Sequence, residues 1–526
     1  MRILIFHGYL LRGTGSNVYN AELAAALVGL GHEVHLLCQD PAPLELGAVD
    51  AVGEWSGGVL QVQSRRDPAR LTAYRPDIGG LLPVYVADRY AGVEARPFPE
   101  LSEAELDRYL DSNVAAVRDV AQRVAPELAL ANHLVMGPAI LARGLPEGMP
   151  YVVKIHGSAL EYTVKPHPRF LPFAQEGLAR AAGVLVGSRH TAESLWAAMD
   201  DSGLPGRTWL GPPGVDVAAF GPREPQAAAA GLRALAARLA AEDPVAPGGE
   251  GEAASSFDRD AAAAGAALEQ LDPGSDRLVC FVGKLIVSKG IDLLLAAWPL
   301  VLARVPDARL LVVGFGAYRA ASERLVAALA AGEDEPVRAL ARSGRAEEGG
   351  PAAPLTHLLA FLDALDADPE RRAGYREAAA RLPGRVVFSG RLEHAELVDV
   401  LPACEAMVVP STFPEAFGMV AAEAAACGTL PLSAHHSGLA EVSDALAAAV
   451  PAAARDWLAF ERGPGAVEAI AERLIAWLEA PEALRRDTRR ALVTTARERW
   501  SWEGVARTVI GVAEGRPGTS PLRPSG

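Results

Sequence analysis

Short apolar runs alternate along most of the chain with longer segments whose apolar residues have helical spacing. Continuous apolar runs of this length are typical of strands buried in parallel sheets, which need helices on both faces. The runs form two series, at 3–6, 34–38, 128–131, 151–155 and 184–186, and then at 278–282, 310–313, 386–388, 406–409 and 430–432. Two such series predict an α/β protein with two doubly wound, Rossmann-like domains.

The two series meet near a rigid turn at Gly211-Pro-Pro-Gly214, so we expect domains at 1–210 and 211–499. Two Ala-rich expansions interrupt the second domain. The first, at about 222–275, is low in complexity and has room for one or two helices. The second, at about 332–385, begins with a predicted loop and continues as a predicted helical hairpin. Neither expansion carries residues that indicate chemistry.

The chain has 526 residues and a formal net charge of −15. An acidic surface repels a phosphate backbone, which argues against a nucleic-acid partner. Four cysteines without metal-ligand spacing predict buried, reduced thiols and a cytoplasmic location. The first apolar run is too short for a signal peptide, and no run is long enough for a membrane-spanning helix. Peripheral attachment to a membrane stays open.

The segment 410–423 is the strongest candidate for chemistry. It follows the predicted strand 406–409, and a helix is predicted to start near Gly418. Glu415 precedes this helix and Glu423 lies on its second turn, so two carboxylates can bind hydroxyls at opposite ends of one elongated ligand. The free amides of the helix start form an anion site between them. The alternative, a capping Glu415 and a solvated Glu423, is the commoner arrangement for an isolated pair.

A second candidate follows the first strand of the second domain, where open parallel sheets bind ligands. Lys284 and Lys289 flank this strand-to-helix loop, with Gly283 and Gly290 beside them. Two ammonium groups five residues apart can converge on a diphosphate and stabilise the charge of a leaving group. The alternative is a pair of ordinary surface lysines.

Two weaker candidates lie in the first domain. Gly13-Thr14-Gly15 joins the first strand to a helix predicted at 16–30, and its glycine spacing is wrong for a dinucleotide fingerprint, which argues against a dehydrogenase. We expect this loop to approach a phosphate or a sugar closely. His156 follows the strand 151–155, where a histidine is either a satisfied structural residue or a catalytic one.

Together and in this order, these blocks resemble the retaining glycosyltransferases of family 4, also called glycosyltransferase group 1, whose fold is GT-B. Further matching blocks lie at 212–216, 313–316, 388–391, 437–441 and 500–503. The resemblance covers nearly all of the chain outside the two expansions. It implies two Rossmann-like domains facing a central cleft, with a last helix at about 500–516 that packs back on the first domain.

The resemblance also implies roles for residues. The catalytic residues would be His156, Glu415 and Lys289. The donor-binding residues would be Gly13, Gly15, Lys284, Lys289, Glu415, Phe417, Gly418, Met419 and Glu423. Within this set Glu423 would bind the ribose, Glu415 the transferred sugar and the two lysines the diphosphate.

Two positions depart from the family pattern. Lys284 stands where the family often has arginine, which keeps the charge and gives up the bidentate fork. Leu439 follows Gly438 where a Gly-Gly pair is common.

The implied reaction moves a hexose-type sugar from a nucleotide-diphosphate donor to the hydroxyl of a glycan, lipid or small-molecule acceptor, with retention. No Asp-x-Asp metal site is evident where the diphosphate would bind, so we expect no metal and no cofactor beyond the nucleotide sugar, which is a co-substrate. Two alternatives on the same fold remain: a nucleotide-sugar epimerase, which changes the sugar without an acceptor, and a catalytically silent binding scaffold.

Overall fold

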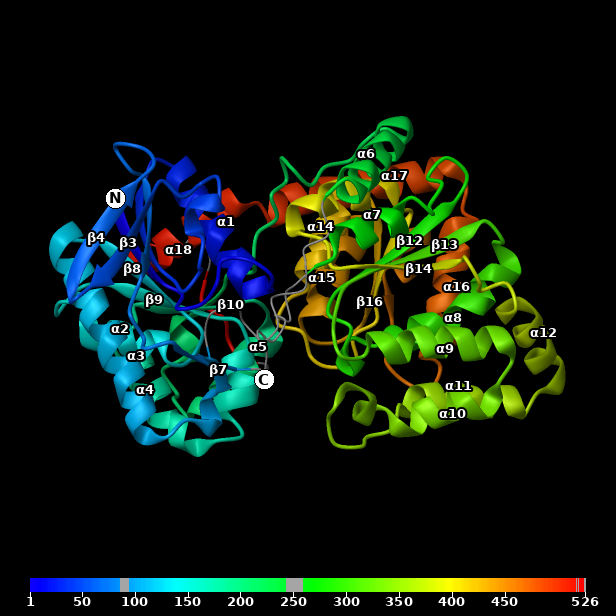
Figure 1. Ribbon diagram of the computed structural model, residues 1–526, viewed down its shortest axis with the longest axis horizontal. Coiled ribbons are helices and arrows are strands. Elements are labelled where there is room, and N and C mark those ends of the chain that lie inside the picture. Colours follow the sequence, from blue (N-terminus) through cyan, green and yellow to red (C-terminus); the bar gives the residue numbers. More distant parts are fainter. Residues whose placement is uncertain (86–93, 243–258, 517, 519, 525–526) are drawn as a thin grey trace. The chain divides into compact units, whose positions relative to one another are not determined.

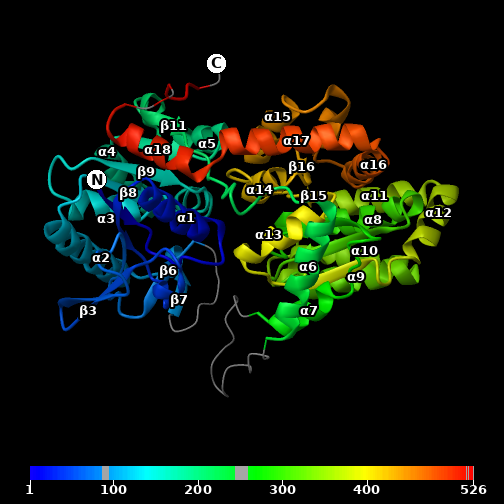
Figure 2. The same cartoon turned by 90° about the horizontal axis from the view of Figure 1, so that it is seen from above.

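The computed structural model describes residues 1–85, 94–242, 259–516, 518 and 520–524. By its internal contacts the described part of the chain divides into two units: unit 1 comprises the described residues up to Gly214 and from Trp500 onward, and unit 2 comprises residues 215–242 and 259–499. Each unit is built around one large sheet with helices packed against it (Figures 1 and 2). The predicted α/β class is confirmed.

The main sheet of unit 1 has the strand order β11-β10-β9-β8-β1-β2-β5-β3-β4. Its strands are β1 (Arg2–Phe6), β2 (Glu33–Leu37), β3 (Ala51–Ser56), β4 (Val59–Ser64), β5 (Leu71–Arg75), β8 (Leu128–Asn132), β9 (Tyr151–Ile155), β10 (Gly183–Val186) and β11 (Thr208–Leu210). A separate parallel pair joins β6 (Leu81–Val84) to β7 (Glu94–Pro97). All five strands predicted for the first domain are present, and their side chains are almost entirely buried, which explains their mainly apolar sequence, with His35 and Lys154 as exceptions.

The sheet of unit 1 is not wholly parallel, which differs from the prediction. Strands β3 and β4 form an antiparallel hairpin at the sheet edge. The side chains of β4 are mostly exposed, so this strand needs no continuous apolar run. Apolar-run analysis therefore missed it.

The helices of unit 1 are α1 (Gly15–Gly29), α2 (Glu103–Val124), α3 (Gly137–Gly144), α4 (Leu171–Ala179), α5 (Arg189–Met199) and α18 (Trp502–Ala513). Helix α18 packs against α1, and the ring centres of Trp502 and Tyr19 lie 5.4 Å apart. Helix α18 is thus built into unit 1, although the whole of unit 2 separates it in sequence from the rest of that unit.

The sheet of unit 2 has the order β14-β13-β12-β15-β16-β17, and its neighbouring strands pair in parallel. The strands are β12 (Arg277–Val282), β13 (Ala308–Val313), β14 (Val386–Gly390), β15 (Ala406–Val409), β16 (Leu430–Ala434) and β17 (Ala459–Phe460). The five strands predicted for the second domain are present, and only the two-residue β17 was missed.

The helices packed around this sheet are α8 (Ile291–Arg304), α9 (Arg319–Ala331), α13 (Leu397–Val400), α14 (Met419–Cys427), α15 (Ser437–Ala447), α16 (Ala466–Leu478) and α17 (Glu482–Arg499). The first expansion supplies α6 (Pro225–Ala240) and α7 (Ala261–Leu268), and its residues 243–258 lie outside the described part. The second supplies α10 (Asp334–Ser343), α11 (Thr356–Asp366) and α12 (Pro369–Ala379). Helix α10 was not predicted within the second expansion. No helix in the described part of the chain has the length and apolar character needed to cross a membrane.

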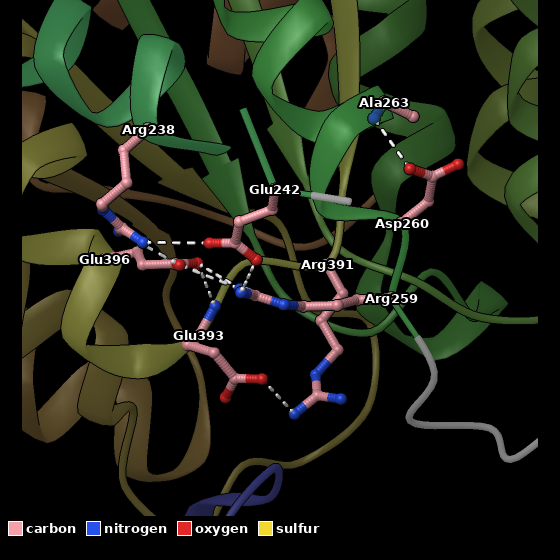
Figure 3. A network of polar contacts seen from close by, with 8 residues as sticks. All are labelled: Arg238, Glu242, Arg259, Asp260, Ala263, Arg391, Glu393 and Glu396. Carbon is pink, nitrogen blue, oxygen red and sulfur yellow. Dashed lines mark hydrogen bonds and ion pairs between the residues drawn. The ribbon is translucent and has the colours of Figure 1, made fainter. Parts of the chain in front are cut away.

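An ion-pair network ties the first expansion to the segment after β14 (Figure 3). Arg259 donates to both carboxylate oxygens of Glu396, at 2.9 and 2.8 Å, and to Glu242 at 3.1 Å. Arg238 donates to the same Glu396 at 3.3 Å. Glu396 also accepts from the amide of Glu393 at 2.7 Å. The network fixes the turn that follows β14, a turn that contributes to the candidate site.

Candidate functional site

The order in which the chain adds strands to the sheet of unit 2 reverses between β12 and β15. From β12 the chain adds β13 and β14 on one side, and it then crosses to add β15, β16 and β17 on the other. Ligands of open α/β sheets bind beyond the carboxyl ends of the strands at such a switch point. The loops that leave β12 and β15 there are the two segments that the sequence singled out.

The two loops touch through their backbones. Gly290 has φ of +66°, and a Cβ atom there would lie 2.0 Å from the carbonyl oxygen of Pro410. Only glycine allows this approach. The amides of Thr412 and Phe413 donate to the carbonyl of Ser288, at 2.9 and 3.3 Å. The short turn η6 (Val287–Lys289) therefore rests directly on the loop before α14.

Lys289 and Glu415, predicted from separate segments, form an ion pair in which the ammonium group donates to the carboxylate. Ser411 donates to the same carboxylate oxygen at 2.6 Å. Burial raises the pKa of Glu415, but the charge and hydrogen bond of Lys289, with help from Ser411 and His436, more than offset this and hold the pKa below its usual value. Glu415 is therefore ionised at neutral pH. Its backbone amide donates to Ser437 Oγ at 2.9 Å.

Helix α14 begins directly after this pair. Its N-cap, Gly418, has φ of +120° and no side chain to bond to the amides of the first turn. These amides and the helix dipole attract negative charge. Leu439 packs against the same point, because a Cβ atom on Gly418 would lie 2.6 Å from Leu439 Cδ2. The departure from a Gly-Gly pair thus places a buried leucine beside the helix start. The side chain of Phe417 is buried as well.

Glu423 lies on the second turn of α14 and is 2% exposed. His394 Nε2 lies 2.8 Å from its Oε1, and because an ionised carboxylate only accepts, the histidine is the donor. His394 starts the turn η8 (His394–Glu396), which the network of Figure 3 anchors through Glu396. The sequence did not indicate His394. Its one sequence cue was its place three residues after the matching block 388–391.

Lys284 lies against an aromatic ring. Its Nζ is 6.0 Å from the ring centre of Phe315, and the guanidinium carbon of Arg391 is 5.8 Å from the same centre. A Cβ atom on Gly314 would lie 1.9 Å from the carbonyl oxygen of Gly283, so glycine is needed where this loop meets the end of β12. Arg391 is thus a third cation at the carboxyl ends of these strands, and the sequence analysis gave it no role.

The remaining predicted site residues belong to unit 1. Gly13 has φ of +92°, and Gly15 is the first residue of α1. His156 follows β9, and its Nε2 lies 2.8 Å from Asn132 Oδ1. Asn132 donates in turn to Asn20 Oδ1 at 2.6 Å.

The backbone carbonyl of Phe6 fixes which end of the Asn132 amide faces His156. Asn132 Nδ2 also faces the carbonyl oxygen of Phe6 at 3.3 Å, so its Oδ1 must face His156. His156 therefore carries its proton on Nε2. Burial, with the neighbouring His133, Lys154 and His7, holds the pKa of His156 well below its usual value, and the imidazole is neutral at pH 7. The histidine is hydrogen-bonded and held in one tautomer.

A buried lysine beside His156 gives the first testable prediction. Lys154 is 1% exposed, donates to the carbonyl of Gly211 and lies 5.2 Å from the ring centre of Tyr19. Burial lowers its pKa to about 7. Between pH 7 and the usual pKa near 10.5, the unfolded chain binds more protons than the folded one. The free energy of unfolding should therefore rise with pH in this window, by at most about 1.4 kcal/mol per pH unit.

Lys154→Met should remove this slope. Urea unfolding of wild type and variant at several pH values from 7 to 10 measures it. Lys165→Met is the matched control, because Lys165 is exposed and pairs with Glu161. Parallel pH curves for wild type and Lys154→Met would contradict the prediction.

Comparisons with known proteins agree with this architecture. Residues 368–499 match the family model of the glycosyl transferases group 1, and residues 14–200 match that of the glycosyl transferase 4-like domain. Glu415, Gly418 and Glu423 lie inside the first match, whereas Lys284 and Lys289 lie between the two. No curated protein sequence matches the chain.

Several solved structures share the fold. Sucrose-phosphate synthase from Thermosynechococcus elongatus aligns with a TM-score of 0.56 at 19% identity, over 98% of each chain. The Anabaena protein HepE, in complex with UDP and glucose, aligns with a TM-score of 0.56 at 15% identity, over 98% of this chain and 100% of the other. The catalytic domain of starch synthase IV from Arabidopsis thaliana, bound to ADP and acarbose, aligns with a TM-score of 0.53 at 12% identity, over 98% and 99%. The chain thus carries a glycosyl transferase 4-like domain and a group 1 glycosyl transferase domain, and it has the GT-B fold.

Proposed function

We propose that the protein is a retaining, metal-independent transferase that moves a hexose-type sugar from a nucleoside-diphosphate donor to an acceptor hydroxyl. The observation that carries the proposal is the Lys289–Glu415 pair beside the uncapped start of α14, at the switch point of the unit 2 sheet. One ammonium group, one carboxylate and a set of free amides suit a ligand that has sugar hydroxyls next to phosphates.

The positive charge at this point would receive the diphosphate. Lys284, Lys289 and Arg391 are the cations, and the first-turn amides of α14 add the positive end of a helix dipole. These groups would take the place of a metal ion in stabilising the leaving phosphate. Glu415, kept ionised by Lys289, would accept hydrogen bonds from hydroxyls of the transferred sugar.

Transfer would break the bond between the anomeric carbon and the phosphate oxygen and form a bond from that carbon to the acceptor oxygen on the same face. The departing phosphate oxygen would take the acceptor proton, which leaves the nucleoside diphosphate as the second product. The residues of the chain would supply position and charge and would need no separate base.

The donor class draws support from the solved relatives. HepE was solved with UDP and with UDP-glucose, and starch synthase IV with ADP and acarbose. UDP and ADP carry different bases, so we propose the diphosphate and leave the base unassigned. Glu423, held by His394, would bind the ribose.

Unit 1 would supply the acceptor side. We propose that the Gly13–Gly15 loop approaches the donor phosphates and that His156, neutral and with a fixed tautomer, contacts the transferred sugar. The acceptor would be a glycan, a lipid or a small molecule, and the protein would act in the cytoplasm.

A lysine-protection experiment tests the donor site. The chain has only four lysines, Lys154, Lys165, Lys284 and Lys289. We expect UDP, ADP or GDP to slow the acetylation of Lys284 and Lys289 by acetic anhydride, followed by mass spectrometry, because the bound diphosphate covers both amines. Exposed Lys165 is the internal control and should react at the same rate throughout. If none of the three nucleotides protects either lysine, the donor-site proposal is wrong.

Incubation with a nucleotide sugar alone distinguishes the transferase from an epimerase. A transferase leaves the donor sugar unchanged until an acceptor is added, whereas an epimerase converts it to a stereoisomer.

A further inference from the structure

The loop that leaves β12 and carries the η6 turn with Lys289 is held from three directions. Leu285 is bound by the loop after β13, where its amide donates to the carbonyl of Phe315 at 2.7 Å. Ser288 is bound by the loop after β15, through the amides described above. Val287, between them, is bound by the second expansion, for which the sequence indicated no chemistry.

The contact to the second expansion is a hydrogen bond to a carboxylate. The amide of Val287 donates to Glu348 Oε2 at 2.7 Å. The Glu348 side chain is 11% exposed, and its other oxygen accepts from Arg345 Nε at 3.2 Å. A hydrogen bond from an amide to a partly buried, ionised acceptor is among the stronger ones in proteins.

The loop that presents Glu348 is itself tightly closed. Gly344 has φ of +49°, and a Cβ atom there would lie 1.9 Å from the carbonyl oxygen of Ala353. The amide of Arg345 donates to the same carbonyl at 3.0 Å, and the amide of Gly350 donates back to Arg345 O at 3.0 Å. The turn η7 (Arg345–Glu348) is therefore built on a backbone that glycine and these bonds hold in place.

We propose that Glu348 is a positioning residue, through which the second expansion holds the Lys289 turn in the conformation that binds the donor diphosphate. This inference rests on the proposed function. Without the carboxylate, the amide of Val287 loses its acceptor and the turn keeps only its contacts to the other two loops. Ligand binding would then have to supply the free energy that orders the turn, which weakens the binding.

The sign of the effect separates positioning from simple electrostatics. Glu348 places a negative charge near a site proposed for an anion, so removal of that charge alone should tighten diphosphate binding. Loss of a positioning contact should weaken it. The two explanations therefore predict opposite changes for Glu348→Ala.

The test compares three variants by titration with UDP, ADP and GDP, using whichever binds wild type. We expect Glu348→Ala to weaken binding about tenfold. In turnover its KM for the donor should rise while kcat stays near that of wild type. Glu348→Gln keeps an acceptor oxygen and should stay within about threefold of wild type. Glu347→Ala is the matched control, since Glu347 lies on the same turn and pairs with Arg324 instead. Unchanged or tighter binding by Glu348→Ala would overturn the inference.

Hydrogen exchange makes the test independent of the ligand. In the free protein, the amides of 287–290 should exchange faster in Glu348→Ala than in wild type, and those of Glu348→Gln should change less. Failure of wild type to bind any of the three nucleotides would count against the proposed function, while the exchange data would still report on the contact. Identical exchange in wild type and Glu348→Ala would overturn the inference.

Discussion

Replacing Lys289 with alanine is expected to lower kcat/KM for sugar transfer by about 100- to 1,000-fold, the usual cost of removing one group that stabilises developing charge. The ammonium group lies at the switch point of the unit 2 sheet and pairs with Glu415. Its loss would remove charge from the leaving phosphate and would also leave the Glu415 carboxylate without its cation. Steady-state kinetics with saturating acceptor measure the effect.

The pH dependence of the free energy of unfolding shows whether the variant has lost the cation that pairs with Glu415. In wild type the pKa of Glu415 is held below its usual value, so this group adds stability above the unfolded pKa that is lost as pH falls through the folded pKa. In Lys289→Ala burial should dominate and raise the pKa above its usual value, which reverses the sign of this dependence, so that the contribution of Glu415 to stability no longer falls as the pH falls. Lys289→Arg keeps the charge and should recover part of the activity, and circular dichroism should show an intact fold. Turnover of Lys289→Ala near the wild-type rate would contradict the site assignment.

Most of the parallel strands in both sheets could be predicted, because a strand that is buried on both faces has a mainly apolar sequence. The parallel strands β3, β5 and β11 of unit 1 were missed. Strand β15 is apolar throughout and β9 is interrupted only by Lys154, and the bounds of both agree with the structure to the residue. Strand β4 could not be found in this way, since its side chains face solvent at a sheet edge. Helix α10 was missed because only Val337, Leu340 and Ala341 are buried in it, which leaves a short and mostly polar segment.

Residues of the candidate site could be predicted only where a charged side chain lies in the loop that follows a predicted strand. Lys289 and Glu415 each follow a strand of the unit 2 sheet, and the strand order brings those ends together. Residues that act through others leave no such pattern. His394 and Glu348 lie in turns far from α14 and β12 in sequence, and only the folded chain places them on Glu423 and on the amide of Val287.

Replacing Glu423 with alanine is expected to weaken nucleoside diphosphate binding by about 10- to 100-fold, because a charged acceptor for ribose hydroxyls is lost. Glu423 is 2% exposed and is oriented by His394, so its carboxylate is held in place before a ligand arrives. The measurement is isothermal titration with UDP, ADP or GDP, whichever binds wild type.

A double cycle, in which the protein and the ribose are each changed, shows whether the lost binding comes from the ribose hydroxyls. Wild type should discriminate strongly against the 2′,3′-dideoxy form of the same nucleotide, whereas Glu423→Ala should bind both forms alike. Glu423→Gln keeps an acceptor for His394 and separates the ribose contact from stability, because Glu423→Ala also removes the carboxylate to which the half-buried His394 donates, a hydrogen bond worth about 1.5–3 kcal/mol. Full discrimination by Glu423→Ala would show that another group reads the ribose and that Glu423 serves only to anchor the turn after β14.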